Sequence, residues 1–226
     1  MKFRLGLIFL VLILISNGFA QVSEVTFEEV KLKGIGSISI PSIMELQSGT
    51  YKQFSDKFSK EMGFDVSGVI IFQQSGRNDV FKASNTYARV MVEETVGKAG
   101  DYRRITSKII LTKSELKTLD AETKRTMING FQATGGGQKL LRWDGVSVDN
   151  INGRSAMKIA YLRQLEDNPP VYVELYYIEN YDREYLLTIS YRQEDASIWK
   201  ETLKKTKNSF NITNIRQPIT RKRNNR

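Results

Sequence analysis

The segment between Gln138 and Gln193 constrains the fold of this chain more than any other. Its apolar and polar residues alternate, and clusters of asparagine, aspartate, glycine and proline interrupt the alternation. This pattern is typical of antiparallel strands joined by tight turns. The strands are expected at residues 139–148, 155–164, 171–179 and 184–192, with turns at 150–153, 168–170 and 180–182. The sequence therefore predicts a four-stranded antiparallel meander in the second half of the chain.

Three helices are expected beside this sheet. The first has aromatic and methionine side chains recurring on one face, at Tyr51, Phe54, Phe58 and Met62. The second is predicted at residues 112–131, where Thr112 and Glu115 have the spacing of a capping box. The third is predicted at residues 195–208, with Asp195 as its N-cap. Each helix has one apolar stripe, so each is expected to pack on a face of the sheet.

Shorter apolar segments predict further strands at residues 36–41, 69–72 and 86–95. In the last of these segments, Ala88, Val90 and Val92 alternate toward one side. Hairpin-linked strands with helices at intervals are typical of the α+β class. We therefore expect an α+β fold with a central, mostly antiparallel sheet packed between helices, which is an α/β/α sandwich.

Both ends of the predicted domain resemble the PsbP/Mog1-like superfamily. The segment Ile38-Ser39-Ile40-Pro41, followed by the aromatic helix, resembles the start of these proteins. The strand Tyr185-Leu186-Leu187-Thr188-Ile189-Ser190, followed by Trp199 and then Ser209-Phe210, resembles their end. The resemblance implies the same sandwich of a sheet between helices.

The functions found in this superfamily limit what the resemblance implies. Its members include photosystem accessory proteins, a nuclear-transport GTPase binder and many exported bacterial proteins of unknown role. The metal-associated histidines of the photosystem members have no counterpart here, because the chain has no histidine. The resemblance therefore implies only a non-catalytic accessory or binding module.

The first twenty residues have the features of a secretory signal peptide. Lys2 and Arg4 precede a run of apolar residues, and small residues stand before Ala20. We expect cleavage between Ala20 and Gln21. The mature protein is then expected to be exported to the bacterial periplasm or the extracellular space and to be soluble. A retained N-terminal anchor is the alternative.

The positive charge of the chain is concentrated outside the predicted domain. Of the net charge of +9, two basic residues belong to residues 1–20 and five to residues 216–226, which leaves +2 on residues 21–215. A nearly neutral, exported domain argues against a nucleic-acid partner. We expect a single α+β domain at 21–215 and a basic, disordered tail at 216–226. The alternative for the tail is a weak contact with anionic lipid, lipopolysaccharide or peptidoglycan acids.

The chain contains no cysteine and no histidine. Catalytic sites of the Ser-His-Asp and Cys-His types, and zinc sites built from histidine or cysteine, are therefore excluded. We expect no cofactor and no metal site. The sequence leaves open an envelope hydrolase that uses Ser114 with Lys117, as penicillin-binding enzymes do, or paired carboxylates, as glycosidases do. The candidate carboxylate pairs are Glu93/Glu94, Asp120/Glu122, Glu166/Asp167 and Glu194/Asp195.

Tyrosines are the candidate binding residues, because seven of the ten lie between Tyr161 and Tyr191. We interpret Tyr161, Tyr172 and Tyr176, with Arg163 as a polar rim, as a ligand-binding surface of the sheet. The alternative is cross-strand packing beneath a helix. The sequence thus predicts a non-catalytic binding or accessory protein of the bacterial cell envelope, which recognises a partner protein, a peptide or a glycan.

Overall fold

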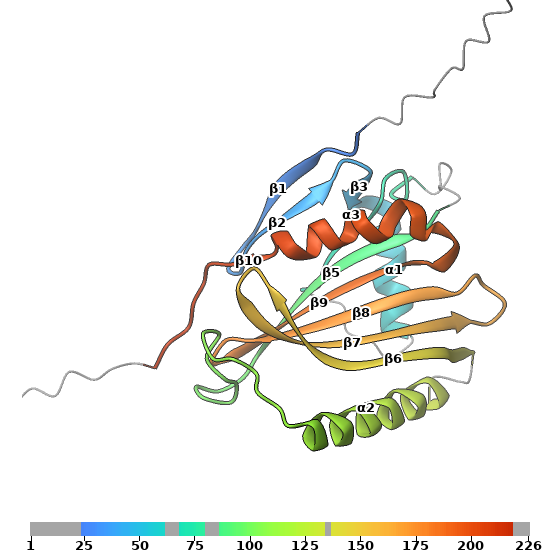
Figure 1. The fold of residues 1–226 in the computed structure, drawn as a ribbon. Coiled ribbons are helices and arrows are strands. Elements are labelled where there is room, and N and C mark those ends of the chain that lie inside the picture. Colours follow the sequence, from blue (N-terminus) through green and yellow to red (C-terminus); the bar gives the residue numbers. More distant parts are fainter. Residues whose placement is uncertain (1–23, 62–67, 80–85, 134–136, 219–226) are drawn as a thin grey trace, which may run out of the picture.

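The computed structural model describes residues 24–61, 68–79, 86–133 and 137–218. The predicted signal peptide and residues 219–226 of the predicted tail lie outside the described residues. Within these ranges, ten strands and three α-helices form two antiparallel sheets with helices on both sides (Figure 1). The prediction of an α+β fold with an antiparallel sheet between helices is therefore confirmed.

The larger sheet has seven strands, and every neighbouring pair is antiparallel. Its spatial order is β3 (Met44–Leu46), β4 (Ile70–Gln74), β5 (Ala88–Val96), β9 (Arg183–Arg192), β8 (Val171–Glu179), β7 (Arg154–Leu165) and β6 (Gln138–Ile151). The predicted meander is confirmed as β6 to β9, in which each strand pairs with the next one along the chain. Pairing of β5 with β9 joins this meander to the first half of the chain.

The turn between β6 and β7 illustrates why the meander could be predicted. Ile151 pairs with Arg154, which leaves Asn152 and Gly153 as a two-residue loop. Both loop residues have positive φ, 47° and 80°, as the tight hairpin turn that matches strand twist requires. The Gly153 N–H also donates to the side-chain oxygen of Asn150 at 2.9 Å. Asparagine and glycine adopt this backbone conformation at low cost.

The smaller sheet consists of β1 (Phe27–Leu32), β2 (Gly36–Pro41) and β10 (Asn211–Ile212), with β2 in the centre. Strand β2 is at the predicted position, whereas β3 and β10 were not predicted. The strand β10 passes so close to β2 that a Cβ atom on Gly36 would lie 1.8 Å from the carbonyl oxygen of Asn211. Only glycine therefore fits at the start of β2.

The helices cover opposite faces of the larger sheet. They are α1 (Gly49–Glu61), α2 (Lys113–Ala133) and α3 (Ala196–Ser209), so all three predicted helices are present. The helix α3 and the smaller sheet lie in front of the larger sheet in Figure 1, and α1 lies behind it. On the rear face, Arg89 of β5 donates to the Tyr51 hydroxyl of α1 at 3.1 Å. None of the helices in the described ranges is both long enough and apolar enough to cross a lipid bilayer.

Two predicted helix caps have different outcomes. The capping box of α2 is confirmed, since the Glu115 carboxylate accepts from the Thr112 N–H at 2.7 Å and the Thr112 hydroxyl accepts from the Glu115 N–H at 3.2 Å. Asp195 occupies the predicted N-cap position of α3, but the expected side-chain cap is wrong. The carboxylate of Asp195 makes no capping hydrogen bond and accepts from the backbone N–H of Tyr87 at 3.0 Å. It therefore ties the start of α3 to the start of β5.

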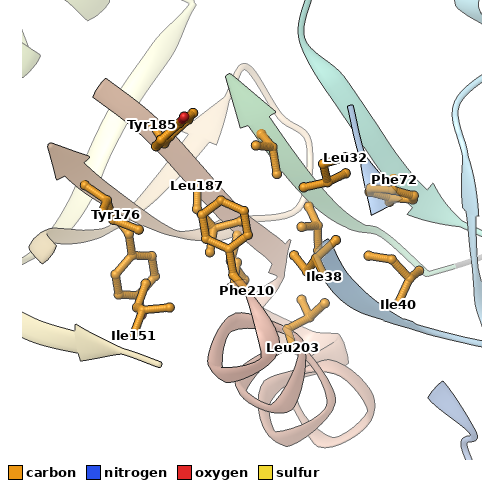
Figure 2. Close-up of a cluster of buried hydrophobic side chains, with 14 of the residues drawn as sticks. Leu32, Ile38, Ile40, Phe72, Ile151, Tyr176, Tyr185, Leu187, Leu203 and Phe210 are labelled. Carbon is orange, nitrogen blue, oxygen red and sulfur yellow. The ribbon is translucent and has the colours of Figure 1, made fainter. Parts of the chain in front are cut away.

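The main core lies between α3, the smaller sheet and the front face of the larger sheet. Figure 2 shows Ile38 of β2, Leu187 of β9 and Leu203 of α3 within this one cluster. The side chain of Trp199 in α3 is 1% exposed, and its ring nitrogen donates to the Thr86 hydroxyl at 2.6 Å. Burial of these large apolar side chains makes this cluster the main source of stability.

The chain continues past β10 along the surface of the domain. The backbone N–H of Arg216 donates to the side-chain oxygen of Asn180, which is fully buried, at 2.9 Å. The side-chain nitrogen of Asn180 donates in turn to the carbonyl oxygen of Asn214 at 2.8 Å. The first residue of the predicted tail is therefore attached to the domain.

Candidate functional site

A cleft of about 550 Å³ lies between α3 and the front face of strands β6 to β9. Eleven of its lining residues are tyrosines or charged residues. These are Tyr172, Tyr176 and Tyr191, the cationic Arg142, Lys158, Lys200, Lys204 and Lys207, and the anionic Asp144, Asp149 and Glu174. The cleft therefore combines aromatic rings with charges of both signs.

The register of the strands brings these side chains to one face. Tyr172 of β8 stands opposite Tyr191 of β9, and Lys158 of β7 stands opposite Tyr176. Residues directly opposite in an antiparallel pair point to the same side of the sheet. The opposite wall comes from α3, where the spacing of Lys200, Lys204 and Lys207 places three ammonium groups on one side of the helix.

Glu174 is at the centre of a hydrogen-bonded network on the floor of the cleft. Its carboxylate accepts from the Lys158 ammonium at 2.6 Å and from the Tyr176 hydroxyl at 2.8 Å. The hydroxyl of Tyr172 lies 3.5 Å away from the same carboxylate. Burial, and then the negative charge of Glu174, raise the pKa of both phenols. Both tyrosines therefore stay protonated at neutral pH and act as hydrogen-bond donors.

A second ion pair links the floor of the cleft to α3. The Lys207 ammonium donates to the Asp149 carboxylate at 2.9 Å, and only 11% of the Lys207 side chain is exposed. Partial burial works to raise the pKa of Asp149. Two effects outweigh this burial: the hydrogen bonds from Lys207 and the Asn150 N–H, and the positive charges of Lys207 and Lys158. Together they hold the pKa of Asp149 below its usual value. Asp149 is therefore a carboxylate at neutral pH.

Cationic side chains also lie against the rings of the tyrosines. The ammonium groups of Lys158 and Lys207 lie 5.7 Å and 5.2 Å from the centre of the Tyr176 ring, within the range of cation–π attraction. The Arg142 guanidinium lies 5.7 Å from the centre of the Tyr172 ring and pairs with Asp144 at 2.7 Å. These contacts fix the positions of the rings and of the cations together.

The charges of the cleft do not balance. Each of its three carboxylates is paired with one cleft cation, namely Asp144 with Arg142, Asp149 with Lys207 and Glu174 with Lys158. Lys204 lies 3.6 Å from the carboxylate of Glu201, and both of these side chains are largely exposed. Among the described residues, Lys200 has no ion-pair partner, and it is exposed. In the described part of the chain, Lys200 is therefore the cleft-lining cation outside an ion pair, and five cations against four carboxylates, Glu201 included, leave a surplus of one positive charge.

The structure separates the four predicted ligand-binding residues into two pairs. Tyr172 and Tyr176 line the cleft. Tyr161 stands opposite Val173, so it points to the rear face, and Arg163, two residues later on the same strand, lies on that side as well. Tyr161 is 7% exposed and packs beneath α2, with its ring 6.1 Å from that of Phe131. Tyr161 is therefore packed beneath a helix, which was the alternative to a role in ligand binding.

The lysines of α3 were not predicted as site residues. They follow Tyr176 by more than twenty positions in the sequence, and only the packing of α3 on the sheet brings them beside it. One sequence signal could have indicated them. The helix contains four lysines and a single acidic residue, Glu201. An excess of one charge on a helix that packs on a sheet indicates a charged rim.

Asp120, one of the candidate acids, has a structural role. Its Oδ1 atom accepts from the ring nitrogen of Trp143 at 3.0 Å and from the backbone N–H of Val146 at 2.7 Å. These bonds attach α2 to β6 where the pairing of β6 with β7 shifts register, between Trp143 and Gly145. Gly145 has a φ of 101°, and a Cβ atom there would lie 3.1 Å from Asp120 Oδ1. The carboxylate therefore stabilises a β-bulge.

Two further catalytic candidates, the pairs Ser114/Lys117 and Glu166/Asp167, are not part of the cleft lining. Ser114 and Lys117 are both exposed at the start of α2, and no hydrogen bond joins them in the described part of the chain. Glu166 and Asp167 are exposed in the loop between β7 and β8. The described ranges also contain no group of three or more acidic, histidine or cysteine side chains arranged to hold a metal ion.

Comparisons with known proteins give similarity in structure only. No protein-family model matches the sequence, and no curated protein matches it. The solution structure of cyanobacterial PsbP (CyanoP) from Synechocystis sp. PCC 6803 is similar over 85% of this chain and 95% of that chain, with 12% identity and a TM-score of 0.48.

Two further structures are similar at lower TM-scores. A protein from Bacteroides thetaiotaomicron matches over 79% of this chain and 47% of its own, with 8% identity and a TM-score of 0.42. PA94, a protein of unknown function from Pseudomonas aeruginosa, matches over 85% of this chain and 98% of its own, with 14% identity and a TM-score of 0.39. At such identities these similarities say nothing about function.

Proposed function

We propose that this protein is an exported, non-catalytic binding or accessory protein of the bacterial cell envelope, and that its ligand binds in the cleft between α3 and the sheet. The observation that carries the proposal is the cleft itself, which is concave, is lined by tyrosines and has a surplus of positive charge at its rim. Its volume of about 550 Å³ is within the usual range of ligand pockets. Tyrosines with hydrogen-bonding groups around them are typical of recognition surfaces.

The ionisation of the cleft favours binding over hydrolysis. A glycosidase needs a carboxylic acid whose pKa is raised, so that it can protonate the leaving group. The pKa of Asp149 is instead lowered, and both Asp149 and Glu174 are paired with lysines. The phenols of Tyr172 and Tyr176 have raised pKa values, so they are poor nucleophiles at neutral pH. The groups present can hold a ligand in place without reacting with it.

A crosslinking experiment in intact cells tests the proposed binding site. A photo-crosslinking amino acid replaces Lys200 at the rim of the cleft, and crosslinked partners are identified by mass spectrometry. The matched control carries the same amino acid in place of Lys205, whose ammonium lies 5.9 Å from the centre of the Phe27 ring and is not part of the cleft lining. We expect a specific crosslink from position 200 that is absent from position 205. The same products at both positions would contradict the proposal.

A fractionation experiment tests the proposed location. The signal-peptide pattern predicts that the protein is found in the periplasm or the medium, with Gln21 as the first residue after cleavage. N-terminal sequencing of the purified protein measures this directly. Recovery of the full-length chain from the cytosol would contradict the proposed role in the envelope.

A further inference from the structure

We propose that the ligand of the cleft is a sugar that carries an acidic group, either a carboxylate or a phosphate. The inference rests on the proposed binding function and names the ligand class of that same site. Three properties of the cleft support it: the surplus of positive charge, the mixture of hydrogen-bond donors and acceptors, and a partly exposed tyrosine ring.

The surplus of positive charge favours an anionic ligand. The three carboxylates are already paired within the cleft, so none of them is available to a cationic ligand without breaking an ion pair. Lys200 and Lys204 stand one helical turn apart on the exposed rim. Side chains at this spacing are neighbours on the helix surface, so both ammonium groups can reach one acidic group. Such charge-assisted hydrogen bonds are stronger than those between neutral groups.

The mixture of donors and acceptors favours a ligand with many hydroxyl groups. The cleft offers acceptors on Glu174 and Asp149 beside donors on Lys158 and Lys207, whose ammonium groups have three N–H donors each. A hydroxyl group both donates and accepts, so it can bond to a carboxylate and to an ammonium at the same time. The carboxylates of an acidic peptide only accept, so they can bond to the ammonium groups of the cleft but not to Glu174 or Asp149. The same cleft therefore fits an acidic sugar better than an acidic peptide.

Tyr172 supplies a surface for the apolar face of a sugar ring. Its ring is partly exposed in the cleft and is held by contacts on two sides. The Tyr191 ring lies 5.5 Å from it in a tilted arrangement, and the Arg142 guanidinium lies 5.7 Å from its centre. A ring that is already fixed loses little conformational freedom when a ligand binds. Aromatic rings of this kind provide both an apolar surface and a polar hydroxyl.

Calorimetric titration of the full mature chain tests the ligand class. The probes are tri-galacturonate for the carboxylate source and glucose 6-phosphate for the phosphate source. Maltotriose is the neutral control sugar, and tetraglutamate is the acidic control peptide. We expect one or both acidic sugars to bind at low salt, to bind more weakly as salt is added, and to bind more tightly than either control. Equal binding of maltotriose, or tighter binding of tetraglutamate, would overturn the inference.

Variants assign the binding to the cleft. Replacing both Lys200→Ala and Lys204→Ala should weaken binding of the acidic sugar about tenfold and reduce its salt dependence, since each exposed ion pair contributes a modest amount. The single variant Lys205→Ala removes a lysine from the same helix outside the cleft and should change affinity less than about twofold. Tyr172→Ala should weaken binding of acidic sugars at every salt concentration, because the ring contact is not ionic. An equal effect of the Lys205 variant would place binding elsewhere and overturn the inference.

The crosslinking experiment separates failure of the ligand class from failure of the binding function. If position 200 gives a specific crosslink in cells while neither acidic sugar binds, the ligand class is wrong and the binding function stands. If the acidic sugars do not bind and position 200 gives no specific crosslink, both proposals are wrong.

Discussion

Helices cover the two faces of the seven-stranded sheet in different ways. On the front face, α3 contributes side chains that are almost fully buried, including Trp199 and Leu203. On the rear face, α2 is longer, yet no residue of it is fully buried. Its apolar stripe, Leu116, Leu119, Met127 and Phe131, packs on a smaller cluster that includes Tyr161 and Val173. The rear contact therefore depends more on particular polar bonds, and the front contact more on apolar burial.

The difference shows how one set of tyrosine-rich strands can serve two purposes. Tyr161 is packed beneath α2 and has no polar role that the structure describes. Tyr176, on the next strand, is just as buried, but its hydroxyl reaches into the cleft and donates to Glu174. The helix α3 covers the front face only in part and leaves a polar cleft beside its core.

Matched leucine truncations give the largest expected effect and test this comparison directly. Leu203→Ala on α3 should lower the free energy of unfolding by about 3 kcal/mol, because it leaves a cavity in the main core. Leu119→Ala on α2 should cost about 1.5 kcal/mol, because that side chain is only partly buried. Urea unfolding followed by circular dichroism measures both values. Equal losses would show that the two helices are equally important to stability.

Removal of the Asp120 carboxylate should have an intermediate effect. Asp120→Ala takes the acceptor from both Trp143 and Val146, and we expect a loss of about 2 kcal/mol. The exposed Glu122 on the same helix provides the control, and Glu122→Ala should change stability by less than about 0.5 kcal/mol. Unfolding curves give the energies, and the fluorescence of Trp143 reports the local change. If the two variants behave alike, polar bonds do not hold the rear face.

The ion pair of Asp149 with Lys207 gives the smallest expected effect, which depends on pH. Because the folded-state pKa of Asp149 is held below the usual 3.8, the carboxylate stabilises the fold above that pH. This contribution is lost as the pH falls through the lowered pKa. Asp149→Asn should therefore be less stable than the wild type at pH 6, by under about 1 kcal/mol, and the difference should disappear as the pH falls below 3.8.

Unfolding measured from pH 6 to pH 2.5 tests this expectation, with Glu201→Gln on the exposed side of α3 as the control. The control should show little difference from the wild type at either end of the range. A stability difference for Asp149→Asn that is independent of pH would mean that the ion pair does not stabilise the front face.

Much of the fold was predicted because its signals are local. The meander strands alternate in polarity over nine or more residues and end at turn residues such as Asn152 and Gly153. The strands β3 and β10 are three and two residues long, which is too short to show an alternation of apolar and polar residues. The side-chain capping bond expected of Asp195 was wrong for a different reason. Its partner, the N–H of Tyr87, is 108 positions away in the sequence.

The candidate site was predicted only in part, because a site combines side chains from several elements. Alternation along β8 correctly placed Tyr172 and Tyr176 on one face. The register of β7 against β8 decides that Tyr161 faces the other way, and register is set by pairing that a single sequence does not display. The lysines of α3 belong to the site only through the tertiary packing of that helix. The sequence thus identified two of the three tyrosines that line the cleft, and none of the α3 lysines at its rim.

The bulges in β6 affect how this protein behaves among other copies of itself. A sheet edge with free backbone groups can template the addition of a foreign strand, which leads to aggregation. One edge here, β3, has only three residues, while the other, β6, has fourteen. The pairing of β6 is interrupted between Leu140 and Arg142 and again between Trp143 and Gly145. These interruptions bend the edge strand β6, so a strand from another molecule cannot keep a regular pairing register along it. The larger sheet therefore resists the addition of strands at both of its edges.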